Sequence, residues 1–107
     1  WFRTNDKGEF IWPGFGDNMR VLMWILDRCD GKVDAQAAPI GWLPFAKDID
    51  TEGLDMDDAV MEELLGVDKQ LWEAEIDGIE EFYSKFDRLP DKLRRELDKL
   101  RSRIAGL

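Results

Sequence analysis

The sequence has no histidine, one cysteine (Cys29) and one tyrosine among its 107 residues. Without histidine there is no imidazole to serve as a general base. A single cysteine excludes disulfide frameworks and, with histidine absent, zinc sites built on sulfur or nitrogen ligands. Carboxylates, lysines and hydroxyls are the groups left for chemistry. A lone thiol suits a reducing compartment, so we expect a cytoplasmic location.

Long apolar runs are absent as well. No stretch approaches the roughly 18 apolar residues that a membrane-spanning helix needs, and no signal segment opens the chain, so we expect no membrane partner. Basic residues are fewer than acidic ones: the chain has 15 lysines and arginines and 24 aspartates and glutamates, which gives a net charge of −9. A surface of that sign repels a phosphate backbone, so we also expect no nucleic-acid partner.

What is present suffices for one compact core. Apolar residues make up 44% of the chain and charged residues 36%, as in globular proteins. The chain opens at Trp1 without an initiator methionine, and we expect it to be part of a longer protein. Acidic and aromatic residues are unevenly spread. Residues 48–81 hold one lysine against fourteen acids, and half of the twelve aromatic residues lie in the first 24 positions.

The N-terminal pattern predicts a hairpin followed by a tight loop. Residues 1–3 and 10–12 are typical of short extended segments, and the polar stretch 5–8 between them is typical of a turn. Over residues 13–16 a proline and two glycines break regular structure. We therefore expect the chain to leave the second strand through a glycine-rich loop.

A helix is predicted directly after that loop. Asp17 or Asn18 is placed to cap its start, and Gly31 marks its end. Its apolar residues recur at spacings of three and four and predict the face that packs on the core: Val21, Leu22, Ile25, Leu26 and Cys29. Residues 33–54 contain two prolines and two glycines and predict an ordered connection, with at most a short strand around 40–43.

Three further helices are predicted in the second half. The first is short, opens with Asp55 and Asp58 as a capping box and stops at Gly66. The second is capped by Asp68, and its apolar face comprises Trp72, Ile76, Ile79, Tyr83 and Phe86. The third has Pro90 in its first turn and an apolar seam of Leu93, Leu97, Leu100 and Ile104. The last two should pack antiparallel.

The predicted fold class is thus α+β and mostly helical, with a short N-terminal hairpin and glycine-rich loop followed by about four helices. Charge supports the antiparallel pair, because the acidic face of residues 73–81 can lie near the basic face of the last helix: Lys92, Arg94, Arg95, Lys99, Arg101 and Arg103. Exposed pairs of this kind contribute only about 0–1 kcal/mol each. The acidic stretch leaves open a second interpretation, a docking surface for a basic partner.

Residues 10–18, with the sequence FIWPGFGDN, crowd rings, glycines and a polar cap into a strand–loop–helix transition. A helix start offers unpaired backbone donors, and glycines let a ligand approach the backbone closely. Aromatic rings can sandwich a nucleobase, and an asparagine amide can contact its edge. The residues alone leave two interpretations open: a site for a flat ligand, or rings that are simply core and an asparagine that is simply a cap.

The same stretch resembles a known family. WFR at 1–3, FIWPGFGDN at 10–18, RVL at 20–22 and PIG at 39–41 are similar to the C-terminal part of GTP-dependent phosphoenolpyruvate carboxykinase. The resemblance runs in register from Trp1 to the final helix, so it covers essentially the whole chain. It implies that residues 1–107 are a C-terminal portion of the catalytic domain of that α/β fold. Within it, 1–18 would be a guanine-binding segment and 19–107 a helical packing region.

The resemblance also implies residue roles. Guanine would lie between Phe2 and Phe15, with Phe10 lining the pocket and Asn18 contacting the base edge. The remaining GTP-binding residues implied are in the adjoining loop: Gly14, Gly16 and Asp17. Three positions depart from the family's usual pattern, because Asp17 replaces a more common glutamate, Met19 a small polar residue and Trp42 a tyrosine.

The implied activity is the gluconeogenic conversion of oxaloacetate and GTP to phosphoenolpyruvate, carbon dioxide and GDP. Mn²⁺ or Mg²⁺ would assist in the full-length enzyme through ligands outside this chain. We expect no catalytic and no metal-binding residue here, and an isolated chain without activity. The implied partners are the guanine nucleotide and the remainder of the parent enzyme, itself a monomer. The competing class is a non-enzymatic acidic helical interaction module.

Overall fold

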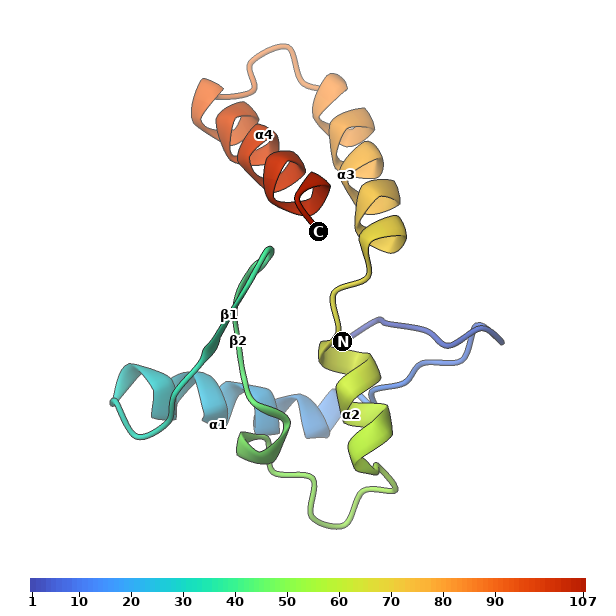
Figure 1. The fold of residues 1–107 in the computed structure, drawn as a ribbon, viewed down its shortest axis with the longest axis vertical. Helices are drawn as coiled ribbons and strands as arrows, with labels where there is room; N and C mark the ends of the chain where they lie inside the picture. Colours follow the sequence, from blue (N-terminus) through green and yellow to red (C-terminus); the bar gives the residue numbers. More distant parts are fainter. The chain divides into compact units, whose positions relative to one another are not determined.

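The computed structural model describes residues 1–107 and is mostly helical (Figure 1). Four α-helices account for most of the regular structure: α1 (Asn18–Cys29), α2 (Asp58–Leu65), α3 (Lys69–Ser84) and α4 (Asp91–Ala105). The other elements are short: strands β1 (Gln36–Ala38) and β2 (Gly41–Leu43), and single 3-10 turns η1 (Phe15–Asp17) and η2 (Ala46–Asp48). The predicted class, α+β and mostly helical, is confirmed. None of the helices combines the length and apolar character needed to cross a membrane.

The chain divides into two compact units. The N-terminal unit comprises Trp1–Ala37 and Trp42–Gly66, and the C-terminal unit comprises Ala38–Gly41 and Val67–Leu107. The candidate residues of the glycine-rich loop all belong to the N-terminal unit, whereas the antiparallel helix pair belongs to the C-terminal unit.

The predicted N-terminal hairpin is present as one antiparallel bridge, between Thr4 and Phe10, rather than as two paired strands. Asn5 explains why the ladder is so short. Its side-chain oxygen accepts hydrogen bonds from the backbone amides of Lys7 and Glu9, at 2.9 and 3.0 Å. Such local side-chain bonds compete with a β-ladder for the same donors. Backbone hydrogen bonds from Asn5 to Glu9 and from Ile11 to Arg3, both 2.9 Å, flank the bridge, so the predicted hairpin and its turn are confirmed but the paired segment is shorter than predicted.

α1 begins and ends where the sequence predicts, but neither predicted cap forms. The Asp17 carboxylate pairs with Arg20 and the Asn18 amide accepts from Trp12, so neither side chain bonds the first-turn amides. At the other end, Gly31 has φ +71°, a left-handed conformation that glycine adopts without steric cost and that helix ends favour.

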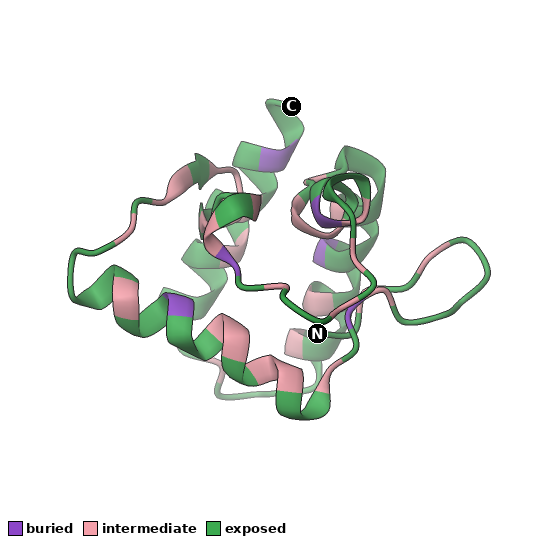
Figure 2. Cartoon of the chain, turned by 90° about the horizontal axis from the view of Figure 1, so that it is seen from below, coloured by how far each residue is buried: buried purple, intermediate pink, exposed green.

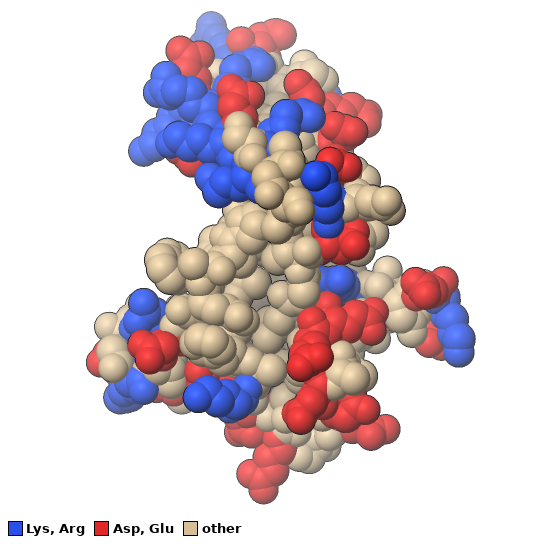
Figure 3. All heavy atoms as spheres, viewed as in Figure 1, with Lys and Arg blue, Asp and Glu red and all other residues tan.

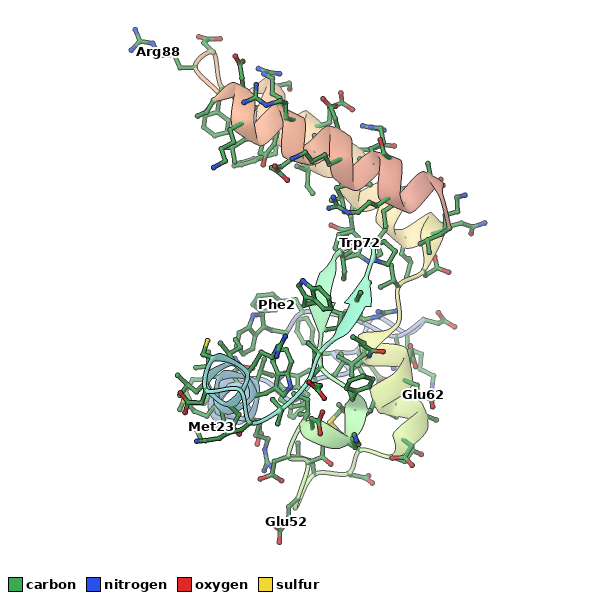
Figure 4. The ribbon with its side chains drawn as sticks, turned by 60° about the vertical axis from the view of Figure 1, so that its left-hand side comes forward. Phe2, Met23, Glu52, Glu62, Trp72 and Arg88 are labelled. Carbon is green, nitrogen blue, oxygen red and sulfur yellow. The ribbon has the colours of Figure 1, made fainter.

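The predicted packing face of α1 is wrong. The buried residue of this helix is Trp24, and Leu22, Ile25, Leu26 and Cys29 of the predicted face are exposed. Figure 2 shows the helix mostly in the colour of exposed residues, and Met23, labelled in Figure 4, belongs to the exposed set. Trp24 lies on the same side of α1 as Arg20, Asp27 and Arg28, so the apolar stripe of this helix points away from the core and periodicity predicts the wrong arc. Of the predicted face, only Val21 packs against the core.

The core of the N-terminal unit forms around Trp12, Trp24, Ile49 and Met61. Half-buried apolar residues from α1, α2 and the connecting loops complete it: Val21, Val33, Ala35, Ala46, Leu54, Met56, Leu64 and Leu65. The indole nitrogen of Trp24 is buried without a hydrogen-bond partner. An unpaired buried donor costs about 1–3 kcal/mol, so this core is not fully satisfied within the chain.

Two predictions for the middle of the chain need correction. The connection contains two paired strands, because β1 accompanies the expected strand β2. Gln36 of β1 also donates from its side chain to the carbonyl of Pro44, at 2.8 Å. α2 is capped by Asp57, whose carboxylate accepts from Val60 at 2.9 Å, and not by the predicted Asp55. Its predicted end at Gly66 is confirmed.

In the C-terminal unit, α3 and α4 pack antiparallel as predicted (Figure 1). The Asp68 carboxylate caps α3 by accepting from Leu71 at 2.9 Å. Ile76 and Ile104 are fully buried, at 1% and 0% exposure, and belong to the predicted apolar faces of the two helices. The stripe of apolar residues on each helix therefore predicts the packing of this pair.

Some details of the predicted pair are wrong. Pro90 stands directly before α4 rather than within its first turn. Phe86 of the predicted α3 face and Leu93 of the predicted α4 seam are exposed. Both residues lie close to the connection between the helices, at the end of the pair, where less apolar surface is covered.

Of the basic residues predicted to face the acidic side of α3, one forms ion pairs with that side. Arg101 of α4 bonds Asp77 and Glu80 of α3, at 3.4 and 2.5 Å. Arg103 instead donates to the carbonyl of Pro39, at 2.5 Å. Figure 3 shows basic side chains gathered over α4, and in the N-terminal unit acidic side chains over α2 and the loop before it. Figure 4 labels one acidic residue of each part, Glu52 in the loop before α2 and Glu62 on α2.

Candidate functional site

The glycine-rich loop has an unusual backbone. Gly14 has φ +73° and ψ −164°, a region that is essentially restricted to glycine. The next residue, Phe15, has φ +52° and is the one non-glycine residue of the chain with positive φ. A bulky residue in this region stores about 1–2 kcal/mol of strain. The loop closes at Asp17, whose backbone amide donates to the Gly14 carbonyl at 3.1 Å.

The three candidate phenylalanines point into solvent. Phe2 is 80% exposed, Phe10 66% and Phe15 100%. Phe2 and Phe10 meet edge to face, with ring centroids 6.1 Å apart and planes at 61°, because the Thr4–Phe10 bridge brings their backbones together. Phe15 stands on η1 and makes no aromatic contact of its own. None of the three rings belongs to the core, so the interpretation of these rings as simple core residues is wrong for this chain.

Asn18 is held by a buried neighbour. The indole nitrogen of Trp12 donates to the side-chain oxygen of Asn18 at 2.9 Å. Trp12 is 2% exposed and part of the core, whereas Asn18 is half-buried at the first position of α1. The amide nitrogen of Asn18 makes no hydrogen bond within the chain and remains available.

Asp17 is held by Arg20, one helical turn further on. The guanidinium donates to the Asp17 carboxylate at 3.0 Å and to the carbonyls of Asp50 and Glu52 at 3.0 and 2.9 Å. One side chain thus ties the glycine-rich loop to the connection that follows η2. Sequence reasoning missed both supporting residues, Trp12 and Arg20. The i, i+3 spacing of Asp17 and Arg20 was the available signal for the second.

A separate hollow of about 290 Å³ opens in the same unit. Apolar side chains line most of it: Trp1, Trp12, Val21, Pro44, Ile49, Met61, Leu64 and Leu65, with Arg3 as the one charged residue. None of the candidate residues lines this hollow. Arg3 is engaged with α2, since it donates to the carbonyl of Gly66 at 2.8 Å. The hollow and the candidate surface are therefore two distinct features of the N-terminal unit.

The chain offers no group of three or more acidic, cysteine or histidine side chains placed to hold a metal ion. The candidate site thus consists of exposed rings, an oriented amide, a strained glycine loop and the Asp17–Arg20 ion pair. Such a set can hold a flat ligand by stacking and edge contacts.

Comparison with known proteins gives the family. Residues 1–103 match the model described as the phosphoenolpyruvate carboxykinase C-terminal P-loop domain. This chain belongs to the phosphoenolpyruvate carboxykinase family. It is 50% identical over 106 residues to a protein of Arthrobacter sp. (strain FB24), and 49% identical over 108 residues to one of Treponema pallidum (strain Nichols). A third relative, from Neocallimastix frontalis, is 45% identical over 108 residues. All three are named phosphoenolpyruvate carboxykinase (GTP).

These matches cover nearly all of this chain and little of each relative. The aligned segments take in 98–99% of the chain but only 17–18% of the carboxykinases concerned. Every candidate residue lies inside the segment that matches the carboxykinase model. The chain therefore corresponds to a small part of a much longer enzyme, and the candidate surface lies within that part.

Proposed function

We propose that this chain is the guanine-nucleotide-binding part of a GTP-dependent phosphoenolpyruvate carboxykinase, the enzyme that converts oxaloacetate and GTP to phosphoenolpyruvate, carbon dioxide and GDP in gluconeogenesis. Family membership supports the activity. The observation that carries the role of this chain is the exposure of Phe2, Phe10 and Phe15 beside a strained glycine loop. Three large rings that add nothing to the core are suited to contact a ligand.

Stacking is the main source of binding energy in this proposal. Each base–aromatic contact is worth about 1–3 kcal/mol, and it depends little on charge. Phe2 and Phe15 form the two walls, and Phe10 supports Phe2 at its edge. The loop backbone at Gly14, Gly16 and Asp17 approaches the nucleotide closely, since glycines leave no side chain in the way. This explains why rings, rather than basic residues, dominate the segment 1–18.

The edge of the base is assigned to Asn18. Its free amide nitrogen is a hydrogen-bond donor, and the six-position carbonyl of guanine is an acceptor. Adenine carries an amino group at the same place, which would meet that donor unfavourably. The proposed contact therefore accounts for a preference for GTP.

In this proposal the chain positions the nucleotide and does not carry out the chemistry. Decarboxylation and phosphoryl transfer belong to the rest of the enzyme, which would supply the phosphate loop, the substrate-binding groups and the ligands for Mn²⁺ or Mg²⁺. Orientation by itself lowers a barrier substantially, because it removes the entropy cost of bringing the reactants together. We accordingly propose that the isolated chain is inactive. A monomeric parent and a cytoplasmic location complete the proposal.

The outward arc of α1 supports a covering by the rest of the parent enzyme. Its apolar side chains are 41–57% exposed: Met19, Leu22, Met23, Ile25 and Leu26. An exposed apolar arc of this size on a helix is typical of a surface that packs against other polypeptide. More than four fifths of each carboxykinase relative lies outside the matched segment, which provides the polypeptide to cover this face. Residues 19–107 would then serve as a packing region that holds segment 1–18.

The decisive experiment places Phe15→Ala in the full-length enzyme. Loss of one stacking wall should raise the KM for GTP by about tenfold or more. Phe15 is fully exposed in this chain and adds nothing to the core of the N-terminal unit, and thermal unfolding of the variant enzyme checks that it folds. Phe86→Ala is the matched control, since Phe86 is also exposed and lies in the C-terminal unit. A KM for GTP that stays at its wild-type value in Phe15→Ala would show that the proposed pocket is wrong.

A further inference from the structure

Asn18 has only one orientation that its neighbour permits. An indole nitrogen carries a hydrogen and can only donate, so the atom of Asn18 that lies 2.9 Å from Trp12 must be the amide oxygen. The amide nitrogen, with its two hydrogens, then faces the other way. This assignment follows from the chemistry of the two groups alone.

Trp12 is itself fixed in place. Its side chain is 2% exposed and packs in the core with Trp24, Ile49 and Met61. A core side chain of this size has almost no freedom to change rotamer. The hydrogen bond to Asn18 therefore starts from a rigid donor, and it restrains the more exposed amide rather than the reverse.

We propose that Trp12 is a positioning residue that determines base preference: its indole N–H holds the Asn18 amide so that a donor, and not an acceptor, faces the nucleotide. This inference rests on the proposed function of the chain. Trp12 does not touch the base. It acts by preventing the Asn18 amide from flipping. In the flipped orientation the amide oxygen would face the base and accept a hydrogen bond from the amino group at position six of adenine.

The chemistry of the bases makes this orientation selective. Guanine and hypoxanthine both present a carbonyl at position six, whereas adenine presents an amino group there. If the Asn18 amide nitrogen is fixed toward the base, it donates to the carbonyl of guanine or hypoxanthine, and it meets another donor in the amino group of adenine. A freely rotating amide would satisfy either kind of base, because its two ends have opposite hydrogen-bonding character. Unpaired polar groups are a strong source of discrimination between ligands.

The test compares nucleotides in the full-length enzyme with Trp12→Phe. Phenylalanine keeps an aromatic ring in the core and lacks the N–H, so the amide becomes free to turn. The preference for GTP over ATP, measured as the ratio of the two kcat/KM values, should fall by about tenfold. The preference for GTP over ITP should stay unchanged, because these two bases share the carbonyl.

Trp24→Phe is the matched control. It removes an indole from the same core, but this indole has no hydrogen-bond partner and no contact with Asn18. A general loosening of the core would lower kcat/KM for all three nucleotides together and leave their ratios unchanged. If Trp12→Phe and Trp24→Phe both leave the GTP-to-ATP ratio at its wild-type value, the proposal is overturned.

A double substitution separates this inference from the proposed function. In an Asn18→Ala background there is no amide to orient, so adding Trp12→Phe should produce no further change in the GTP-to-ATP ratio. If Asn18→Ala and Phe15→Ala leave the kinetics with GTP unaltered, the proposed site is wrong. If they impair GTP use while Trp12→Phe preserves base preference, only the role of Trp12 is wrong.

A measurement on the unaltered core covers the case in which Trp12→Phe does not fold. With ¹⁵N-labelled tryptophan, one of the five indole N–H resonances contributed by this chain should shift upfield in Asn18→Ala, because its hydrogen bond is lost. In the wild-type enzyme the same resonance should keep its downfield position when GDP binds. Failure to find any shifted resonance, or loss of the bond on GDP binding, contradicts the proposal.

Discussion

The guanidinium of Arg20 joins the carboxylate of Asp17 to the backbone carbonyls of Asp50 and Glu52. Three hydrogen bonds from one planar group tie the end of the glycine-rich loop to a segment about thirty positions away in sequence. Lysine carries the same charge as a single point and cannot form this fork. The shape of the loop that carries Phe15 thus depends on a residue outside the loop.

Arg20→Lys should therefore destabilise the N-terminal unit by about 1–2 kcal/mol, since charge-assisted bonds to partly exposed groups are lost. Urea unfolding followed by tryptophan emission measures the change. Arg94→Lys is the control, because Arg94 is exposed and has no partner. Equal stability of the two variants would show that the fork does not stabilise the loop.

Phe15 allows strain and stacking to be measured separately. At φ +52°, glycine fits without steric cost whereas alanine does not, so Phe15→Gly should be more stable than Phe15→Ala by about 1 kcal/mol. Both variants lack the ring and should bind GDP equally weakly. Thermal unfolding and calorimetric titration provide the two readouts. A less stable glycine variant would argue against strain at this position.

In the C-terminal unit, buried apolar contacts should contribute more to the free energy of unfolding than the exposed ion pairs do. Ile76→Ala opens a cavity at a residue that is 1% exposed and should cost about 2–5 kcal/mol. Arg101→Gln removes exposed pairs with Asp77 and Glu80 and should cost about 1 kcal/mol or less, with most of the effect gone at high salt. Denaturant unfolding at two salt concentrations measures the free energy of unfolding of each variant. A larger decrease for Arg101→Gln than for Ile76→Ala would contradict the prediction.

The outward arc of α1 should make the isolated chain self-associate. Leu26→Glu should reduce this association with little change in stability, because glutamate is as good a helix former and Leu26 is exposed. Leu71→Glu is a close control, since both leucines are 57% exposed and Leu71 lies outside the arc. Sedimentation over a range of concentrations distinguishes the variants. The arc is not responsible if both behave alike.

Glu96 gives a local pH dependence. A hydrogen bond from Lys99, strengthened by the charge of that lysine, lowers the pKa of the Glu96 carboxyl. A carboxyl whose pKa is lower in the folded chain adds stability above its unfolded pKa, and this contribution is lost as pH falls through the folded value. Lys99→Met should raise the pKa of Glu96 again, as measured by NMR titration. Lys92→Met should have a smaller effect, because Lys92 acts only through its charge at greater range.

The sequence predicts helices well where their apolar residues form one stripe. The α3–α4 pair has a single seam and a cap at Asp68, and the structure contains both. α1 is predicted at the right place but with the wrong buried face, because its apolar stripe is exposed in this chain and Trp24, on the side of Arg20 and Asp27, is buried instead. The short strand β1 escapes prediction, since its two alanines have little β propensity and its pairing with β2 is a tertiary feature.

For the candidate site, the sequence indicates the residues but not their supports. Rings and glycines stand out in residues 10–18 because they are rare together. Nothing in that stretch reveals that Trp12 bonds Asn18 or that both predicted caps are engaged elsewhere. The cap of α2 is misassigned to Asp55 for a similar reason: three aspartates lie within four positions, and folding decides that Asp57 caps the helix.

The exposure of Phe2, Phe10 and Phe15 has an evolutionary consequence. Substitutions at these positions would leave the core of the N-terminal unit almost untouched, so in the proposed role selection would act on them mainly through ligand affinity. A lineage can exchange one of these side chains for another in single steps without passing through a misfolded ancestor. Trp12 is different, because any replacement must also fill the core and, in the proposed role, keep the Asn18 amide oriented.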